Sequence, residues 1–185
     1  MKRVFDFVAA ALGLIILSPV MLVVAITVRA TSDGPAVFAQ TRVGRAERLF
    51  TCYKFRTMAK GAPNAGSHDV SGSWITPVGR KLRATKLDEL PQLFNVLRGD
   101  MSLVGPRPCL PSQTELVIAR RQKGVYRIRP GITGPAQLAG IDMSTPHELA
   151  EADAAYAVSR SFLGDIRLMF LTVLGRGSGD AVKRA

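Results

Sequence analysis

The chain has 185 residues, the length of one domain by a prior of roughly 100–200 residues, and its 47% apolar and 21% charged residues exclude intrinsic disorder. Two cysteines, without a Cys-x-x-Cys pair or a histidine cluster, exclude a disulfide-stapled scaffold and argue against a thiolate zinc site. The net charge of +11 is concentrated in residues 42–129 and predicts an anionic partner: nucleic acid, an anionic membrane surface or a phosphorylated substrate.

Residues 7–28 form an uncharged apolar run, which as one helix would be about 33 Å long and would span a bilayer core of ~30 Å. Ser18-Pro19 interrupts the run. Proline removes a backbone donor, which predicts a kink or a break, and Ser18 can bond a freed carbonyl. Lys2, Arg3 and Arg29 flank the run, and the positive-inside rule disfavours moving either flank across a membrane. Two interpretations stay open: a kinked spanning helix, and a helix–break–helix hairpin that enters one leaflet and returns.

After the apolar run, the sequence predicts a β-hairpin and then helices. Residues 37–40 and 50–55 are short β-prone runs. Apolar residues within 87–97 recur at spacings of three and four and predict a helix that starts near Asp88 and ends at Gly99. Three more helices are predicted, over residues 112–123, 146–158 and 162–174. The expected fold class is α+β and mostly helical, with a small β-hairpin element.

Asp88 and Glu89 lie at this proposed helix start, in the most basic part of the chain. Adjacent acids at a helix start often only complement the helix dipole at the surface. In this basic field, however, a carboxylate stays ionised at neutral pH and can serve as a metal ligand or a nucleophile. Neighbouring helical residues point about 100° apart, so the two acids are not opposed across one bond. Asymmetric roles are therefore expected, with one acid attacking and the other assisting.

Two proline-containing segments are candidates for phosphate binding. Arg107 lies between two prolines that hold it extended, which suits bidentate phosphate recognition. An ordinary turn with an exposed arginine would have the same sequence pattern. Arg129 opens a second segment that either offers backbone donors to a ligand or is a simple loop. Neither a P-loop nor a Rossmann glycine motif occurs. Nucleic acid is disfavoured as the partner because aromatic residues are 6% and no RNP-like or helix-turn-helix pattern is present.

The motifs of this chain, taken in sequence order, resemble those of a known family, the bacterial monotopic phosphoglycosyl transferases, often called bacterial sugar transferases. The resemblance covers nearly the whole chain and is most specific between residues 87 and 108. Its motifs are Lys2-Arg3, Phe5-Asp6, Ser18-Pro19, Gly34-Pro35, Phe38, Gln40, Arg42-Val43-Gly44, Lys54-Phe55-Arg56-Thr57-Met58, Gly79-Arg80, Leu82-Arg83, and the stretches 87–93, 95–97, 99–108 and 129–134.

The resemblance implies transfer of a sugar-1-phosphate from a UDP-sugar to undecaprenyl phosphate, with release of UMP. This step would start assembly of a membrane glycoconjugate such as O-antigen, capsule, exopolysaccharide or a glycoprotein glycan. Asp88 would be the nucleophile, through a covalent phosphosugar intermediate, and a Mg²⁺ ligand, with Glu89 as its catalytic partner. Ser18-Pro19 would break a re-entrant membrane helix. Contacts to the substrate would come from Lys54, Arg56, Arg83, Arg107 and Arg129.

The resemblance also implies a division of the chain into a re-entrant membrane helix over residues 1–30 and a cytoplasmic catalytic domain over residues 31–185 at the membrane interface. The protein would be monotopic, on the cytoplasmic face of the bacterial plasma membrane. Its expected partners are inner-membrane lipids, downstream glycosyltransferases and a second copy of the chain, and not nucleic acid.

Residues 135–142 depart from the Trp-Gln-Val-Asn-Gly stretch of many relatives, in a region expected near the sugar. An N-acetylated amino sugar is the expected donor sugar. The rival class of function is a membrane-tethered module that binds polyanions without catalysis. It explains the charge but leaves Asp88 and Glu89 unexplained, and magnesium-dependent release of UMP from UDP-sugars distinguishes the two.

Overall fold

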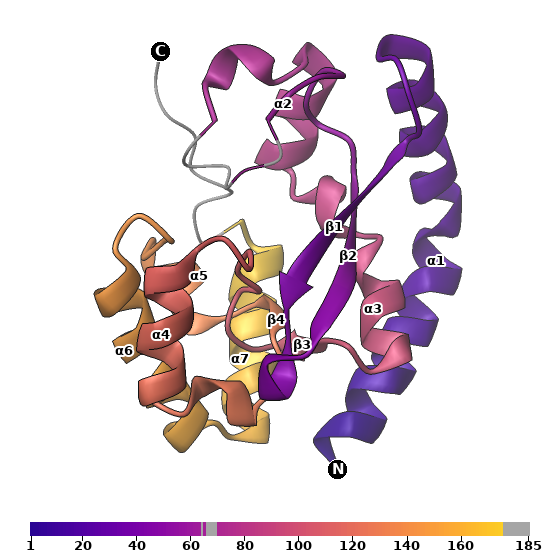
Figure 1. Cartoon of the computed structure of the whole chain (residues 1–185). Helices are drawn as coiled ribbons and strands as arrows, with labels where there is room; N and C mark the ends of the chain where they lie inside the picture. Colours follow the sequence, from indigo (N-terminus) through magenta and orange to yellow (C-terminus); the bar gives the residue numbers. More distant parts are fainter. Residues whose placement is uncertain (64, 66–69, 176–185) are drawn as a thin grey trace.

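The computed structural model describes residues 1–63, 65 and 70–175. One long helix runs along one side of the molecule, a β-hairpin lies in the centre, and α4 and α6 gather on the other side (Figure 1). The elements in chain order are α1 (Lys2–Thr31), β1 (Val37–Val43), η1 (Arg45–Glu47), β2 (Leu49–Phe55), η3 (Gly72–Trp74), α2 (Pro77–Ala84), η4 (Leu87–Glu89), α3 (Gln92–Arg98), β3 (Ser102–Val104), α4 (Thr114–Gln122), η5 (Val125–Arg127), β4 (Gly131–Thr133), α5 (Pro135–Ala139), α6 (Pro146–Ser159) and α7 (Phe162–Val173). The expected α+β, mostly helical class is confirmed.

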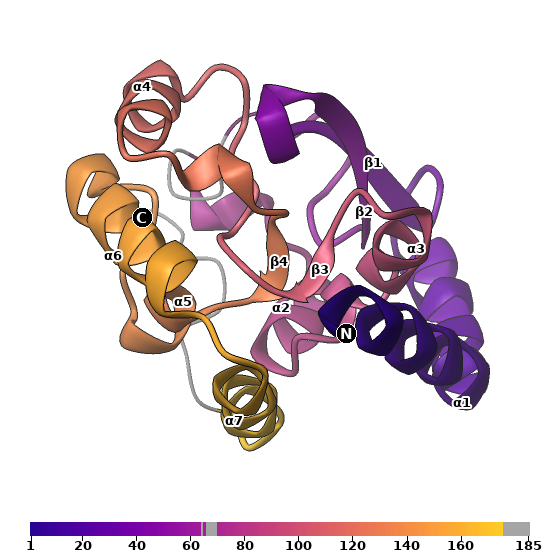
Figure 2. The same ribbon diagram turned by 90° about the horizontal axis from the view of Figure 1, so that it is seen from below.

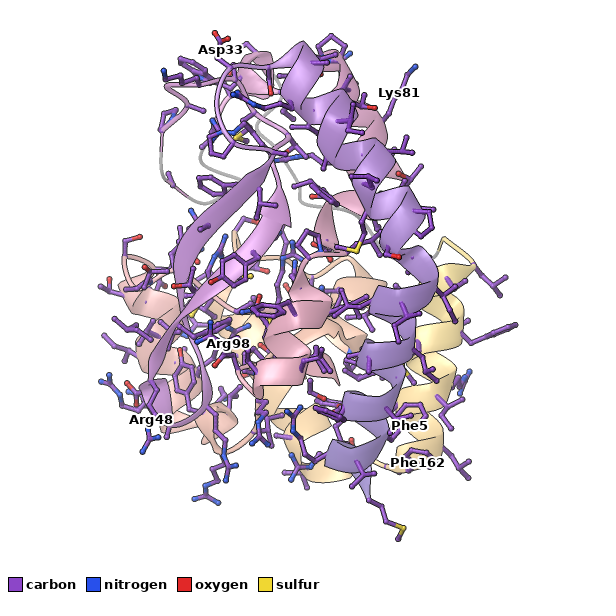
Figure 3. The ribbon with its side chains drawn as sticks, turned by 90° about the vertical axis from the view of Figure 1, so that its right-hand side faces the viewer. Phe5, Asp33, Arg48, Lys81, Arg98 and Phe162 are labelled. Atoms are coloured by element: carbon purple, nitrogen blue, oxygen red, sulfur yellow. The ribbon has the colours of Figure 1, made fainter. Side chains whose placement is uncertain are left out.

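The apolar run forms one continuous 30-residue helix, α1, with Pro19 inside it. The helix bends near its middle but does not turn back on itself (Figure 3), so the expected helix–break–helix hairpin is corrected to a bent helix. The cause is local. Pro19 lacks the N–H that would bond the carbonyl of Ile15, and the Ser18 hydroxyl donates to that same carbonyl at 2.8 Å. Because the freed carbonyl is satisfied, the chain continues as a helix.

One face of α1 packs on the rest of the chain from end to end. Near its start, Ala10 is fully buried in a cluster that includes Val96 of α3. Near its end, Val24 and Val28 pack in a second cluster with Leu82 of α2. The helix also has a polar anchor: the buried carboxylate of Asp6 accepts hydrogen bonds from the Ser102 hydroxyl (2.8 Å) and the Leu103 amide (3.3 Å). α1 is therefore an integral layer of the fold.

The predicted hairpin is confirmed as β1 and β2, an antiparallel pair in which Gln40 lies opposite Cys52 and Phe38 opposite Lys54. Side chains alternate between the two faces of such a pair. One face, with Gln40, Cys52 and Lys54, borders a cavity. The edge of β2 that faces away from β1 meets α3, where Asn95 accepts from the Tyr53 amide (3.1 Å) and donates to the Thr51 carbonyl (2.7 Å). The hairpin thus joins the cavity to the core.

A second, parallel pairing joins the two proline-containing segments. β3 pairs with β4, and the Gly131 amide donates to the Pro106 carbonyl at 2.9 Å. A Cβ added at Gly131 would lie 2.0 Å from the Gly105 nitrogen, so only glycine permits this backbone contact. The stretch after Arg129 is therefore a buried strand that supports the Arg107 segment, rather than a loop offered to a ligand.

The helix expected to start near Asp88 is the main local correction. Two helices, α2 and α3, occupy this region, and Asp88 lies between them in the short turn η4. Lys86 has a left-handed backbone conformation (φ 57°) that ends the continuation of α2, and α3 begins only at Gln92. Phe94, expected on the apolar face, is 48% exposed, while Leu93 and Val96 are buried. The predicted end at Gly99 is confirmed by its left-handed φ of 89°.

The C-terminal half follows the predicted helices closely, as α4, α6 and α7. α4 packs on α6, and α7 lies near the start of α1, where Phe5 meets Phe162 edge-on with ring centroids 5.1 Å apart (Figures 2 and 3). Cys52 and Cys109 are buried free thiols, and burial raises the pKa of the Cys52 thiol. Both cysteines therefore serve the packing of the chain.

Candidate active site

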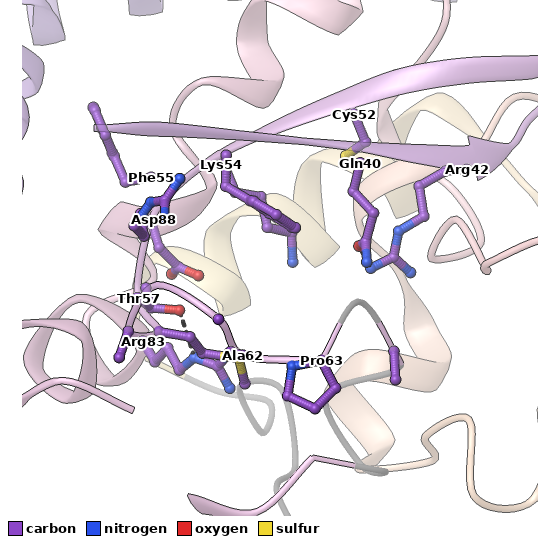
Figure 4. Close-up of a pocket in the computed structure, with 16 residues that line it drawn as sticks. Gln40, Arg42, Cys52, Lys54, Phe55, Thr57, Ala62, Pro63, Arg83 and Asp88 are labelled. Atoms are coloured by element: carbon purple, nitrogen blue, oxygen red, sulfur yellow. Dashed lines mark hydrogen bonds between the residues drawn. The ribbon is translucent and has the colours of Figure 1, made fainter. Parts of the chain in front are cut away.

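A cavity of about 220 Å³ lies between the hairpin face and the segments after it. Strand residues form one wall, residues 57–59, 61–63 and Ala65 form another, and Asp88 lies at one end of the cavity (Figure 4). The cavity brings together four of the predicted site residues, namely Lys54, Arg56, Arg83 and Asp88. Residues far apart in the chain thus line one cavity.

Asp88 is the carboxylate that borders this cavity. Its residue is only 5% exposed, and its side chain points toward the space shared with Lys54 and Arg83 (Figure 4). The turn η4 presents it there because Leu87 and Leu90, on either side, are packed in the cluster beneath α1. Burying a carboxylate costs free energy unless cations or hydrogen-bond donors compensate it. A carboxylate kept at such a place has a role beyond surface solvation.

Arg83 supplies a guanidinium to the same space. Its Nε donates to the Thr57 hydroxyl at 3.0 Å, which holds the group in position. Its Nη1 is buried and has no hydrogen-bond partner in the described part of the chain. An unpaired buried donor is costly, and an oxyanion in the adjoining cavity would satisfy it. The Arg83 guanidinium is therefore a candidate group for binding an anion.

Glu89 joins two of the predicted phosphate-binding cations. Its Oε1 accepts from Lys54 Nζ at 3.3 Å and from Arg107 Nη2 at 2.7 Å, with all three side chains largely buried. Glu89 therefore differs from Asp88 in its surroundings. Its contacts fix the position of Lys54 and Arg107, whereas Asp88 faces the cavity. The two acids thus have different surroundings, and the roles of attack and assistance expected for them stay predictions.

The Arg107 segment is held from behind by two buried arginines that sequence reasoning missed. Arg42 Nη1 donates to the Pro108 carbonyl (3.0 Å), and Arg120 Nη1 donates to the Arg107 carbonyl (2.9 Å). Arg120 also makes two hydrogen bonds to the Asp153 carboxylate, at 2.9 and 2.6 Å. Burial raises the pKa of Asp153, and the charge and hydrogen bonds of Arg120 oppose that rise. The segment is fixed by its surroundings as well as by its prolines.

Both missed arginines left a signal in the sequence. Arg42 alternates with Gln40 along β1, which places both on the cavity face of the hairpin. Arg120 lies four residues after the buried Leu116 and so on the same face of α4. Periodicity alone could have placed both, but it could not have named their partners.

Three predicted substrate contacts are placed differently. Arg107 is not among the described residues that line the cavity, and its Nη2 pairs with Glu89. The Arg56 guanidinium borders the cavity, but it also donates to the carbonyls of Pro35 (3.0 Å) and Asp33 (3.5 Å), so it braces the turn after α1. Arg129 is not brought to this cavity: it lines a separate one at the start of α1. Of the described lining residues, none comes from 135–142, whose helix α5 packs on α6 and α7.

The donor set suits a magnesium ion that is shared with a substrate. Within the described residues, no group of three or more histidine, cysteine or acidic side chains could hold a metal alone. Mg²⁺ does not need one, since it is usually held by one or two carboxylates together with substrate phosphates and water. Asp88, at the wall of a cavity that Lys54, Arg56 and Arg83 also line, fits that pattern.

Comparison with known proteins gives a consistent picture. A family model described as bacterial sugar transferase matches residues 1–176. A UDP-glucose:undecaprenyl-phosphate glucose-1-phosphate transferase of Caulobacter vibrioides is 40% identical over 181 residues, covering 93% of this chain and 68% of that protein. An undecaprenyl-phosphate galactose phosphotransferase of Salmonella typhimurium is 37% identical over 93% of this chain and 39% of its own length. A UDP-N-acetylgalactosamine-undecaprenyl-phosphate N-acetylgalactosaminephosphotransferase of Aeromonas hydrophila is 36% identical over 93% of this chain and 42% of its own.

Proposed function

The chain belongs to the bacterial sugar transferase family and is an enzyme of that family, and from this premise we propose that it transfers a sugar-1-phosphate from a UDP-sugar to undecaprenyl phosphate. The observation that carries the proposal is the buried carboxylate of Asp88 at the wall of a cavity that Lys54 and Arg83 also line. A nucleophile next to cations is what attack on a diphosphate requires. A polyanion-binding module would not need a buried carboxylate there.

We propose two displacements at the phosphorus that carries the sugar. In the first, a carboxylate oxygen of Asp88 forms a bond to this phosphorus, the bond to the bridging oxygen breaks, and UMP leaves with that oxygen. In the second, an oxygen of undecaprenyl phosphate attacks the same phosphorus and releases the Asp88 carboxylate. The product is a lipid diphosphate sugar, and the enzyme returns to its starting state. Each anionic substrate visits the basic cavity in turn, which avoids holding both there together.

The cations have separate tasks in this scheme. Arg83 offers its buried, unpaired Nη1 to a phosphate oxygen in the cavity. Lys54 and Arg107, held by Glu89, stabilise the charge that develops on the phosphoryl oxygens and on the departing UMP. Asp88 would hold Mg²⁺ together with the substrate phosphates, and the ion would supply further neutralisation of negative charge. The proposed role of Glu89 is to position the two cations.

We further propose that α1 lies in one leaflet and does not cross the membrane. The helix is long and apolar enough to span. Its face toward α3 and α2 is nevertheless covered by the rest of the chain along its whole length, and a highly basic domain cannot follow a helix into hydrocarbon. The outer face of α1 is apolar and exposed, as at Leu12 and Ile16, and so is that of α7, as at Phe170. Both faces would enter the cytoplasmic leaflet, with residues 31–185 as the catalytic part.

The donor sugar is proposed to be an N-acetylated amino sugar, of the kind named for the Aeromonas relative. Glucose and galactose, the sugars named for two other relatives, are the competing donor sugars. The product would start a surface glycan or glycoprotein glycan on the membrane, for downstream glycosyltransferases to extend.

The test is UMP release by the full chain in detergent, with Mg²⁺, undecaprenyl phosphate and a panel of UDP-sugars. UMP should be released from UDP-N-acetylhexosamines, and the Asp88→Asn variant should release none. Asp33→Asn, which changes an exposed acid that does not line the cavity, is the matched control and should keep full activity. No release from any UDP-sugar would contradict the proposed reaction. Faster release from UDP-glucose would contradict only the sugar.

A further inference from the structure

A second cavity, of about 370 Å³, lies at the start of α1 between that helix, β3 and η5. None of its described lining residues lines the cavity at Asp88. Its wall is strongly basic, with Lys2, Arg3, Arg45, Arg127, Arg129 and Arg160. The proposed reaction uses none of these side chains, although Arg129 belongs to one of the motifs that the sequence singles out.

The positive charge of this cavity is largely uncompensated. Asp6 is the carboxylate among its described lining residues, and its oxygens already accept from Ser102 and Leu103. Lys2 forms an ion pair with Asp165 outside the lining. For the five arginines, no ion pair to a carboxylate occurs within the part of the chain that the structure describes. Several like charges around one hollow repel one another, and a bound anion would relieve this repulsion.

Two of the arginines are held in place by groups that do not cancel their charge. Arg3 donates to the carbonyls of Val96 (2.6 Å) and Leu97 (3.0 Å) at the end of α3. Arg129 Nε donates to the Gly99 carbonyl at 2.8 Å. Burial, with the nearby charges of Arg3 and Arg45, lowers the pKa of the Arg129 guanidinium. The guanidinium groups are thus preorganised, because backbone carbonyls fix their direction and leave their net charge in place.

We propose that this cavity is an anion-binding site, separate from the catalytic cavity, and that it holds a phosphate group. Arginine is suited to this ligand because its planar fork matches two phosphate oxygens at once. A volume of about 370 Å³ is large beside the ~30 Å³ that one water molecule occupies in the liquid, so it admits a phosphate together with its substituent.

The surroundings favour the headgroup of an anionic phospholipid as the source of the phosphate. Phe5 and Phe162 meet at this end of the molecule (Figure 3). Val4, Phe7 and Leu163, which are close to them in the sequence, are exposed apolar side chains. Basic side chains next to an exposed apolar surface attract anionic lipids to the membrane interface. The site would hold the start of α1 at headgroup depth. A free phosphate or a soluble phosphate ester is the other source of the same chemistry.

Native mass spectrometry of the full chain in detergent tests the site. Dioleoyl phosphatidylglycerol is titrated against dioleoyl phosphatidylcholine, and a separate arm uses glycerol 3-phosphate. The test variant is Arg127→Gln with Arg160→Gln, because both side chains are exposed and form no described ion pair. Arg48→Gln, an exposed arginine that does not line the cavity, is the matched control.

Wild-type protein should bind one phosphatidylglycerol in preference to phosphatidylcholine. The double variant should weaken this binding at least tenfold, and Arg48→Gln less than twofold. If glycerol 3-phosphate shows the same dependence on the two arginines without any preference between the lipids, the phosphate site stands with a soluble ligand. If the double variant binds phosphatidylglycerol as tightly as the wild type does, and glycerol 3-phosphate as tightly as the wild type does, the proposal is overturned. UMP release in detergent should be unchanged in the double variant, so failure of this site is distinguishable from failure of the proposed reaction.

Discussion

Replacing Arg120 by Met should destabilise the protein and weaken its activity by two separable routes. Arg120 is 2% exposed and makes two hydrogen bonds to the buried Asp153 carboxylate. Its loss leaves that carboxylate buried without a counter-charge, which costs about 3–5 kcal/mol. For a chain of this size each kcal/mol lowers the melting temperature by roughly 2–4 °C, so a fall of roughly 6–20 °C is expected.

The loss should also depend on pH. Burial raises the pKa of Asp153, and Arg120 is the group that opposes the rise, so the variant raises this pKa further. A carboxyl whose folded-state pKa is raised keeps its full contribution below the unfolded value of about 3.9 and loses it as pH rises through the folded value. The gap in melting temperature between wild type and variant should therefore be larger at pH 8 than at pH 5.

Thermal unfolding and UMP release of the same samples separate the two routes. Arg120→Met with Asp153→Leu removes the whole pair, which should restore most of the stability because no charge is left buried. Activity should stay low, since the Arg107 carbonyl still lacks its donor. Arg121→Met changes the next residue, an exposed arginine paired with Glu47, and should affect neither measurement. If Arg120→Met unfolds like the wild type, the buried pair does not stabilise the fold. If the double variant regains full activity, the hydrogen bond to the Arg107 carbonyl does not support the site.

Arg107→Lys should slow UMP release, because a point charge lacks the planar fork and about 2–4 kcal/mol of transition-state stabilisation is lost. A Lys variant with full steady-state activity would show that Arg107 is not part of the site. A cysteine placed at Lys2 should resist a membrane-impermeant thiol reagent added outside intact cells, because both ends of α1 are expected on the cytoplasmic side. Labelling there would show that α1 spans. Pro19→Ala should shift α1 toward spanning and toward labelling, since the Ile15 carbonyl then regains a backbone donor and the helix straightens.

Local signals in the sequence were enough for the elements with strong periodicity. The β-hairpin and the helices α4, α6 and α7 follow from alternation or helical spacing, with boundaries within a few residues. Ser18 and Pro19 together predict a bend in α1, but they do not predict how large the bend is. A prediction of a hairpin overestimated the effect of one proline because the hydroxyl bond to Ile15 keeps the helix continuous.

The sequence predicts which residue types belong to the site, but it does not predict how their side chains contact one another. Lys54, Arg83 and Asp88 do meet, but no spacing indicates that Glu89 would hold Lys54 and Arg107, because that contact joins three separate segments. Arg120 and Arg121 are adjacent and chemically identical, yet one is buried and the other exposed. The motif of Arg129 predicts a substrate contact, whereas the segment that leads into strand β4 places this residue at another cavity. Long-range packing decides each of these outcomes.

Asp88 is proposed to attack the UDP-sugar before any lipid binds. The direct measurement is intact-protein mass spectrometry of the full chain after incubation with UDP-sugar and Mg²⁺, without undecaprenyl phosphate. One phosphosugar should be added to the protein and mapped to Asp88, with an equal amount of UMP released, and Asp88→Asn should give neither. Glu89→Gln should still form the adduct, more slowly. The absence of any adduct on rapid trapping, together with UMP release only when lipid is present, would contradict the claim and favour direct attack by the lipid phosphate.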